Sequence, residues 1–306
     1  MPSFDIDSRS HPLLAEMRTI FREHHSFSRD IIDRALTAFG NRWAQDCEET
    51  LRILFPTQDS LAQAVKGYAA FAWDSMRRQA KFERDRTYPA KTHAAAADEV
   101  YFNSDYMMSE YLPGLLLSHF LWPHHYRQLT FFDSAFLEPM RIAGATSFVE
   151  VGVGTGLYSR RLLQHLPELR GSGLDISPSS KLFTDRHMQA FGLRDRYDVL
   201  LEDILDEQFG AQTDWLVCVE VLEHLDDPVE FLRALRRALA PGGRAFITAA
   251  LNAANADHIY LYRAAEEVSA HLDAAGFVLE QSFLGAAYKP SAPGTPVPLA
   301  AAFVVV

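Results

Sequence analysis

The segment FVEVGVGTGLYSR, residues 148–160, constrains the fold more than any other part of this 306-residue chain. It begins as a run of apolar and β-branched residues, and it then passes through Gly152, Gly154 and Gly156 into an amphipathic stretch. Glycine lets a chain turn sharply and lets its backbone lie against a ligand without a Cβ atom between them. The segment therefore predicts a strand, a ligand-facing turn and a helix, the first unit of an α/β domain.

Carboxylates accompany these glycines at positions that suit a different ligand from a dinucleotide. Dinucleotide-binding turns use G-x-G-x-x-G, whereas this chain has G-x-G-x-G with Glu150 before it. A carboxylate there repels a pyrophosphate but can hold the ammonium group of a bound amino acid. Asp175 ends the next expected strand, with Ile176 beside it, and is placed to accept hydrogen bonds from two ribose hydroxyls.

Three more residues complete the expected cofactor site. Asp203 and Ile204 follow the third expected strand, where they offer a carboxylate to an adenine amino group and an apolar flank to its ring. Glu220 follows the fourth strand and is expected to line the same pocket.

The hydrophobic period divides the chain in two. In residues 1–140 the apolar side chains recur at helical spacing, which predicts a mostly helical N-terminal lid domain. Gly40 is the expected stop of one helix, and Asp59 or Ser60 is the expected N-cap of another. Residues 141–306 alternate short apolar runs with helical stretches, including a helix over Pro228–Leu239, which predicts a parallel sheet with helices on both faces. The expected strands are Ser147–Val151, Gly171–Asp175, Asp198–Leu201, Asp214–Val219, Arg244–Thr248, Phe277–Leu284 and Ala301–Val306, the last two forming an antiparallel edge.

Residues 140–306 resemble the class I S-adenosylmethionine-dependent methyltransferases. The resemblance extends from the glycine turn to VCVEVLEHLDDP after the fourth strand and LAPGGRAFIT leading into the fifth, in the order typical of the family. It implies a Rossmann-like sheet of seven strands with the last antiparallel, and S-adenosylmethionine as the cofactor.

A divalent metal site is expected at the acceptor end of this sheet. Glu220, Glu223 and His224 have the spacing i, i+3, i+4, which places them on one face if a helical turn follows the fourth strand. His258 follows the fifth strand, and two carboxylates with two imidazoles suit Mg²⁺, Mn²⁺ or Fe²⁺. The E-x-x-E-H segment is similar to that of the ubiquinone-pathway O-methyltransferases. With His258, it also looks like the small-RNA 3′-end ribose methyltransferases. Both resemblances imply these four residues as metal ligands.

The predicted catalytic residues are His224, His258 and Glu223. Without a metal, His224 is a candidate general base, because imidazole titrates near neutral pH, and a purely structural role is the remaining alternative. The leading hypothesis is metal-assisted O-methylation of a small molecule. The alternatives are C-methylation of an enolisable acyl or keto acid, and a non-catalytic cofactor-binding protein.

Charge restricts the partners. The chain carries 40 acidic and 29 basic residues, a formal net charge of −11, and no block of Lys or Arg stands out in the sequence. Nucleic acid and anionic membranes both require a positive face, so neither is expected as a partner. The expected acceptor is a small molecule, free or tethered to a carrier, and the oligomeric state is open, with a homodimer as one option. Two distant cysteines and no export signal predict a cytoplasmic location.

Overall fold

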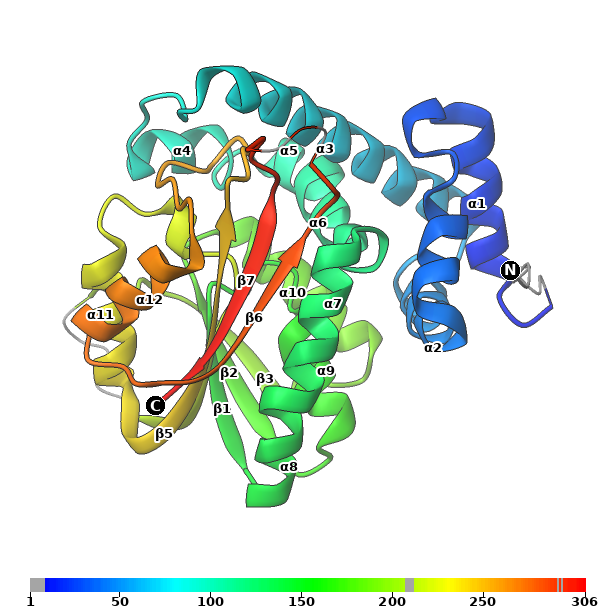
Figure 1. Cartoon of the computed structure of the whole chain (residues 1–306). Helices are drawn as coiled ribbons and strands as arrows, with labels where there is room; N and C mark the ends of the chain where they lie inside the picture. The colour runs from blue at the N-terminus through cyan, green and yellow to red at the C-terminus, as the bar shows by residue number, and fades with distance from the viewer. Residues whose placement is uncertain (1–8, 207–211, 291, 293) are drawn as a thin grey trace.

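A seven-stranded mixed sheet forms the centre of the computed structural model, which describes residues 9–206, 212–290, 292 and 294–306 (Figure 1). Its strand order is β3-β2-β1-β4-β5-β7-β6. The first five strands pair in parallel, and β7 is antiparallel to both of its neighbours. The strands are β1 Ser147–Val151, β2 Arg170–Asp175, β3 Tyr197–Leu201, β4 Thr213–Cys218, β5 Leu239–Leu251, β6 Leu279–Ala286 and β7 Leu299–Val305. The predicted α/β fold with an antiparallel edge is confirmed.

Successive residues of the buried strands point to opposite faces of this sheet, and each face has its own apolar core. Phe148 of β1 belongs to the core beneath α9 (Leu157–His165) and α10 (Pro178–Ala190), whereas Val149 belongs to the core beneath α11 and α12. The latter helices are α11 Pro228–Ala238 and α12 Ala265–Ala274. Helix α11 ends one residue before the predicted Leu239, because that residue begins β5.

Residues before the sheet are helical, as predicted. The helices are α1 Pro12–His24, α2 Ile31–Leu54, α3 Gln58–Asp85, α4 His93–Glu99, α5 Ser104–Tyr106, α6 Leu112–Leu121, α7 Pro123–Phe132 and α8 Glu138–Ala143. Gly40 has non-helical torsion angles (φ 71°, ψ −158°), so it interrupts α2, but the helix resumes beyond it. The cap of α3 is Thr57, not Asp59 or Ser60, and Ser60 completes the capping box with it.

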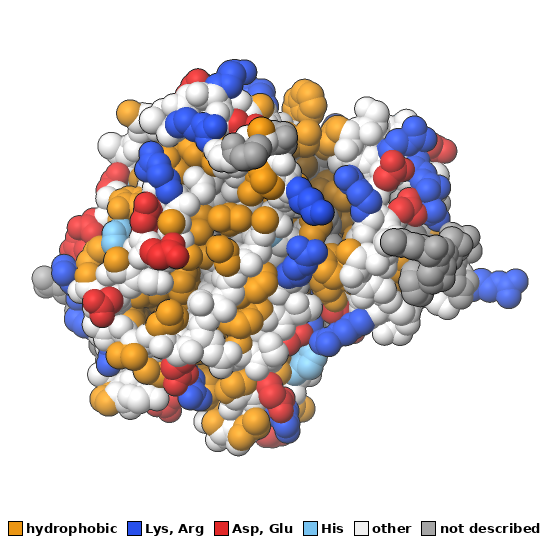
Figure 2. Space-filling view, in the orientation of Figure 1, with side chains coloured by type: hydrophobic (Ala, Val, Ile, Leu, Met, Phe, Trp, Pro, Cys, Tyr) orange, Lys and Arg blue, Asp and Glu red, His pale blue; other side chains and the backbone are white. Residues whose placement is uncertain are grey.

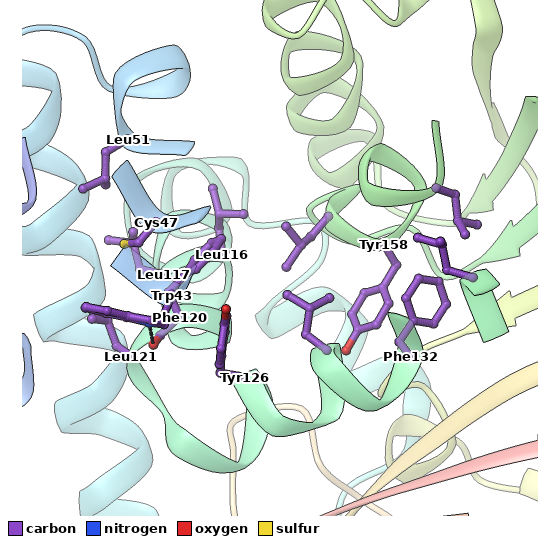
Figure 3. Close-up of a cluster of buried hydrophobic side chains, with 14 of the residues drawn as sticks. Trp43, Cys47, Leu51, Leu116, Leu117, Phe120, Leu121, Tyr126, Phe132 and Tyr158 are labelled. Atoms are coloured by element: carbon purple, nitrogen blue, oxygen red, sulfur yellow. Dashed lines mark hydrogen bonds between the residues drawn. The ribbon is translucent and has the colours of Figure 1, made fainter. Parts of the chain in front are cut away.

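One apolar cluster joins the helical half to the sheet (Figure 3). Trp43 of α2 is fully buried, and its indole Nε1 donates to the carbonyl oxygen of Phe120 at 2.8 Å. Further along the same cluster, Phe132 of α7 meets Tyr158 of α9 edge to face, with ring centroids 4.9 Å apart. Helix α8 runs across residue 140, and the domain boundary placed there stays a prediction.

Helix α3 lies above the carboxyl end of β5 (Figure 1). The buried Gln79 side chain donates to the carbonyl oxygen of Asn252 at 3.1 Å and accepts from the backbone N–H of Ala254 at 3.0 Å. These bonds attach the helix to the loop after β5, where catalytic residues are expected. No helix within the described ranges is both long enough and apolar enough to cross a membrane.

Candidate active site

The glycine turn after β1 has the backbone that its sequence predicts. Gly152, Gly154 and Gly156 have φ values of 76°, 49° and 72°, in the left-handed region that side chains disfavour. A Cβ atom on Gly152 would lie 2.5 Å from Val221, and one on Gly156 would lie 2.7 Å from Thr184. Only glycine therefore fits this turn, which leads into α9.

Two buried carboxyl groups flank the turn. Glu150 accepts hydrogen bonds from the hydroxyls of Ser159 and Tyr197, and burial raises its pKa to about 8. Asp175 accepts from the backbone N–H groups of Gly154 at 3.1 Å and Ser177 at 2.8 Å. Burial raises the pKa of Asp175 to about 6, against the lowering effect of these bonds. Asp175 thus fixes the glycine turn in addition to its expected role toward a ribose.

A cavity of about 840 Å³ opens beside this turn and extends beneath the helical half. Eight of the nine expected cofactor residues line it: Glu150, Gly152, Gly154, Asp175, Ile176, Asp203, Ile204 and Glu220. Gly156 does not line the cavity, because it forms the N-cap of α9. His224 and His258 line the same cavity, so the cofactor end and the expected acceptor end face a common space.

Glu220 departs from the predicted helical turn. Its φ is 53°, and the helical turn after β4 is a 3₁₀ segment over Leu222–His224 that leaves Glu220 outside. The Thr248 hydroxyl donates to its carboxyl group at 2.7 Å. The ligand atoms of Glu223, His224 and His258 lie within 4.8 Å of one another, and Glu220 is not part of this group. The structure therefore brings together three of the four expected metal ligands.

His224 is oriented by a buried aspartate that the sequence did not single out for this role. Its Nδ1 lies 3.2 Å from the carbonyl oxygen and 3.4 Å from Oδ2 of Asp257. Both neighbours are acceptors, so in the neutral imidazole Nδ1 carries the proton and Nε2 is the nitrogen with the free lone pair. The hydroxyls of Tyr111 and Tyr101 donate to the same Oδ2, at 2.6 Å and 3.2 Å.

Asp257 remains ionised in this environment. Burial acts to raise its pKa, but His224, His258 and the Tyr111 hydrogen bond outweigh burial and hold the pKa below its usual value. Burial raises the pKa of both tyrosines well above the usual value, so they remain donors. Both come from the aromatic segment before the sheet, about 150 residues away along the chain. Only the adjacency of Asp257 to His258 hinted at this arrangement in the sequence.

His258 and Glu223 complete the polar group behind His224. His258 Nδ1 donates to the carbonyl oxygen of Ala253 at 2.7 Å, which leaves Nε2 unprotonated, and burial lowers the His258 pKa to about 4. Glu223 is fully buried, and neither of its carboxyl oxygens has a hydrogen-bond partner among the described residues. Burial raises the Glu223 pKa well above the usual value. This carboxyl group is either protonated or compensated by a cation.

A second set of histidines lines the far part of the cavity. His119, His124 and His125 are all buried, and burial lowers each pKa, to about 4 for His119 and about 3 for His124. Trp122 stacks on His124 with ring centroids 5.8 Å apart. His124 and His125 both line this cavity, although adjacent residues on a helix point about 100° apart.

The fold and this site define a class I S-adenosylmethionine-dependent methyltransferase domain, and comparison with known proteins agrees. Residues 149–245 match the methyltransferase domain family model. The chain is 29% identical over 107 residues to the ubiquinone biosynthesis O-methyltransferase of Pseudomonas paraeruginosa, and 30% identical over 114 residues to that of Pseudomonas putida. These matches cover 35% and 36% of this chain, and 45% and 47% of the relatives. The chain thus spans about half the length of the curated relatives it matches.

Two solved structures share the fold over nearly the whole chain. The mitomycin 7-O-methyltransferase MmcR aligns with a TM-score of 0.55 and 17% identity, over 97% of this chain and 93% of its own. PigF with SAH aligns with a TM-score of 0.55 and 14% identity, over 97% and 95%. The shared architecture therefore includes the N-terminal helices as well as the sheet.

Proposed function

We propose that this protein transfers a methyl group from S-adenosylmethionine to an oxygen atom of a small-molecule acceptor. The observation that carries the proposal is the single cavity that Glu150, Asp175, His224 and His258 all line. A cofactor held at the glycine turn and an acceptor beside the histidines would meet there. The matched relatives named as O-methyltransferases support oxygen as the accepting atom.

In the absence of a bound cation, His224 is the group best placed to take the acceptor's proton. Asp257 holds the Nδ1 proton, so the Nε2 lone pair is available to a hydroxyl group in the cavity. The aspartate also stabilises the imidazolium that forms, as a buried carboxylate does in a catalytic dyad. Tyr101 and Tyr111 position the aspartate from the helical half.

The same residues fit a divalent cation. His224 and His258 both donate Nδ1–H to backbone carbonyls, the outer hydrogen bond that metal-ligating histidines make. Glu223 offers two unpartnered carboxyl oxygens next to them. We propose Glu223, His224 and His258 as the ligands, without Glu220. When bound, a divalent ion would supply a Lewis acid that lowers the pKa of the acceptor hydroxyl.

The test follows transfer from S-adenosylmethionine labelled with ¹³C in its methyl group, offered with a panel of phenols and other hydroxyl compounds. The carbon chemical shift of the product distinguishes a methoxy group from a C-methyl group. A methoxy product supports the proposal, and a C-methyl product as the only product contradicts it.

The requirement for a metal is tested by measuring the same reaction after exhaustive treatment of the protein with EDTA. We expect turnover to be lost and to return with Mg²⁺, Mn²⁺ or Fe²⁺, while cofactor binding persists. His258→Ala should lose turnover in the same way, because removing one of three protein ligands weakens the hold on the ion. Full activity after chelation and in His258→Ala would exclude the metal and leave His224 as the base.

A further inference from the structure

A second groove, of about 580 Å³, follows the C-terminal half of α3 on the outside of the molecule. Met76, Ala80, Ala254 and Asn255 line both this groove and the main cavity, so the two spaces adjoin at these four residues. Asn255 also reaches the catalytic group, since its Nδ2 lies 3.4 Å from Nε2 of His258. The groove therefore adjoins the acceptor end of the site.

The charge of this groove is opposite to that of the chain. Its lining includes Arg77, Arg78, Lys81 and Arg84, and no Asp or Glu among the described residues, although acidic residues outnumber basic ones by 40 to 29 overall. Figure 2 shows several Lys and Arg side chains over the upper part of the molecule, where α3 ends in Figure 1, and others spread over the rest of this face.

Two of these four cations are not neutralised within the protein. Arg77 and Arg78 each donate to Asp74 at 2.6 Å. Lys81 and Arg84 are exposed, and neither makes an ion pair with any residue in the described ranges. Their spacing of three places them on one face of α3, so both can contact a single anionic group.

The groove thus has a charged end at Lys81 and Arg84 and borders the main cavity at Met76. Arg84 is eight residues beyond Met76, which corresponds to about 12 Å along a helix axis. Trp73, with 57% of its surface exposed, adds apolar surface to the groove one helical turn before Met76. An anion held by Lys81 and Arg84 would need a linker on the order of 10 Å to reach the cavity mouth.

We propose that this groove binds the phosphate of an acceptor that is presented on a phosphopantetheine arm. The inference rests on the proposed methyl transfer and specifies the acceptor as a tethered one. Guanidinium and ammonium groups are the usual protein partners of phosphate. The arm joins a phosphate to a reactive end through a long, thin chain, which is the shape that the groove and its border with the cavity require. Coenzyme A thioesters and carrier proteins both provide this arm.

The test is calorimetry on the full chain saturated with S-adenosylhomocysteine, so that no nucleotide probe can occupy the cofactor site. The probes are 4′-phosphopantetheine, coenzyme A and pantetheine, which lacks the phosphate. We expect 4′-phosphopantetheine to bind, the affinity to fall as salt is raised, and pantetheine to bind at least about tenfold more weakly. The double variant Lys81→Glu/Arg84→Glu should lose the phosphate-dependent part of the affinity. Arg233→Glu/Arg237→Glu, the same charge change on exposed residues of α11, should bind as wild type does.

The outcomes separate this inference from the proposed function. Absence of S-adenosylhomocysteine binding contradicts the methyltransferase proposal itself. If S-adenosylhomocysteine binds but pantetheine binds as well as 4′-phosphopantetheine, or the Lys81/Arg84 variant binds like wild type, the groove inference is wrong. Tighter binding of coenzyme A than of 4′-phosphopantetheine identifies a coenzyme A thioester as the source, and equal binding identifies a carrier protein.

Discussion

At residue 150 the chain buries a carboxyl group where it is expected to meet the ammonium group of the cofactor. Burial raises the pKa of Glu150 to about 8 and that of Asp175 to about 6. In the free protein Glu150 is therefore largely protonated at pH 7. Because the folded state binds more protons than the unfolded state does, these two groups make the free protein less stable as pH rises from about 4.5 to about 8.

The affinity for the cofactor should increase as pH rises, whereas the stability of the free protein decreases. An ammonium group prefers ionised Glu150, so S-adenosylmethionine affinity should rise between pH 6 and pH 8, by at most about tenfold per pH unit. Calorimetry in buffers of different ionisation enthalpy should also detect proton release on binding near pH 7. Glu150→Gln should bind more weakly and lose the pH dependence. An affinity that is constant over this range in the wild-type protein would contradict the assignment.

Asp257→Asn tests the orientation of His224. The amide can donate to Nδ1 and so favour the wrong tautomer, with the proton on Nε2. We expect kcat to fall by about 10²- to 10⁴-fold, the usual contribution of a general base, and S-adenosylmethionine binding to persist. The pH profile of kcat should also change. Unchanged kcat would mean that Asp257 does not position the base.

Residues close together in the sequence were the ones whose placement could be predicted. Gly152 and Asp175 follow directly from the strand ends that precede them. Tyr111 and Asp257 meet only because helices far along the chain fold over the sheet, and no local pattern encodes that contact. Glu220 was misplaced in the helical turn because sequence spacing does not reveal its left-handed backbone.

At the scale of elements, the joint between α2 and α6 should be a major source of stability. Trp43→Ala removes a fully buried indole and its bond to Phe120, and should lower the free energy of unfolding by about 3–5 kcal/mol. Denaturant titration measures this change. Trp43→Phe should cost less, because it keeps an aromatic ring. An alanine variant as stable as the wild type would contradict the packing shown in Figure 3.

The helical half should be required for activity. A variant that lacks residues 1–137 removes Tyr101 and Tyr111 from Asp257 and uncovers Phe246 of β5, which the rings of the deleted helices contact. We expect this fragment to bind a hydrophobic fluorescent dye and to lose turnover. If the fragment remained monomeric and fully active, the helices would not line the acceptor site.

Most elements were predictable from hydrophobic period and turn residues. Strand β1 has the predicted bounds, and the β6–β7 edge is antiparallel as expected. Strand β5 is longer than predicted, because it continues through the Pro-Gly-Gly segment at residues 241–243 that reads as a loop. The position of α3 above β5 was not predictable, since Gln79 attaches it through backbone atoms, which carry no sequence signal.

At the scale of the whole molecule, the helical half encloses the space into which the sheet presents its loops. The cavity takes its cofactor end from the loops after β1, β2 and β3, its catalytic end from the loops after β4 and β5, and its roof from α3, α6 and α7. We expect reactants held between them to be shielded from water, which would strengthen electrostatic interactions with a charged sulfonium. The function of this cavity therefore depends on which cofactor binds at the glycine turn.

Calorimetric titration of the full chain with S-adenosylmethionine and, separately, with NAD⁺ tests that occupant most directly. We expect S-adenosylmethionine to bind in the micromolar range typical of enzyme substrates, with one cofactor per chain. Asp175→Ala should weaken this binding by about 1.5–3 kcal/mol, the range for hydrogen bonds to a charged group, and NAD⁺ should not bind. Binding of NAD⁺ without binding of S-adenosylmethionine would contradict the account.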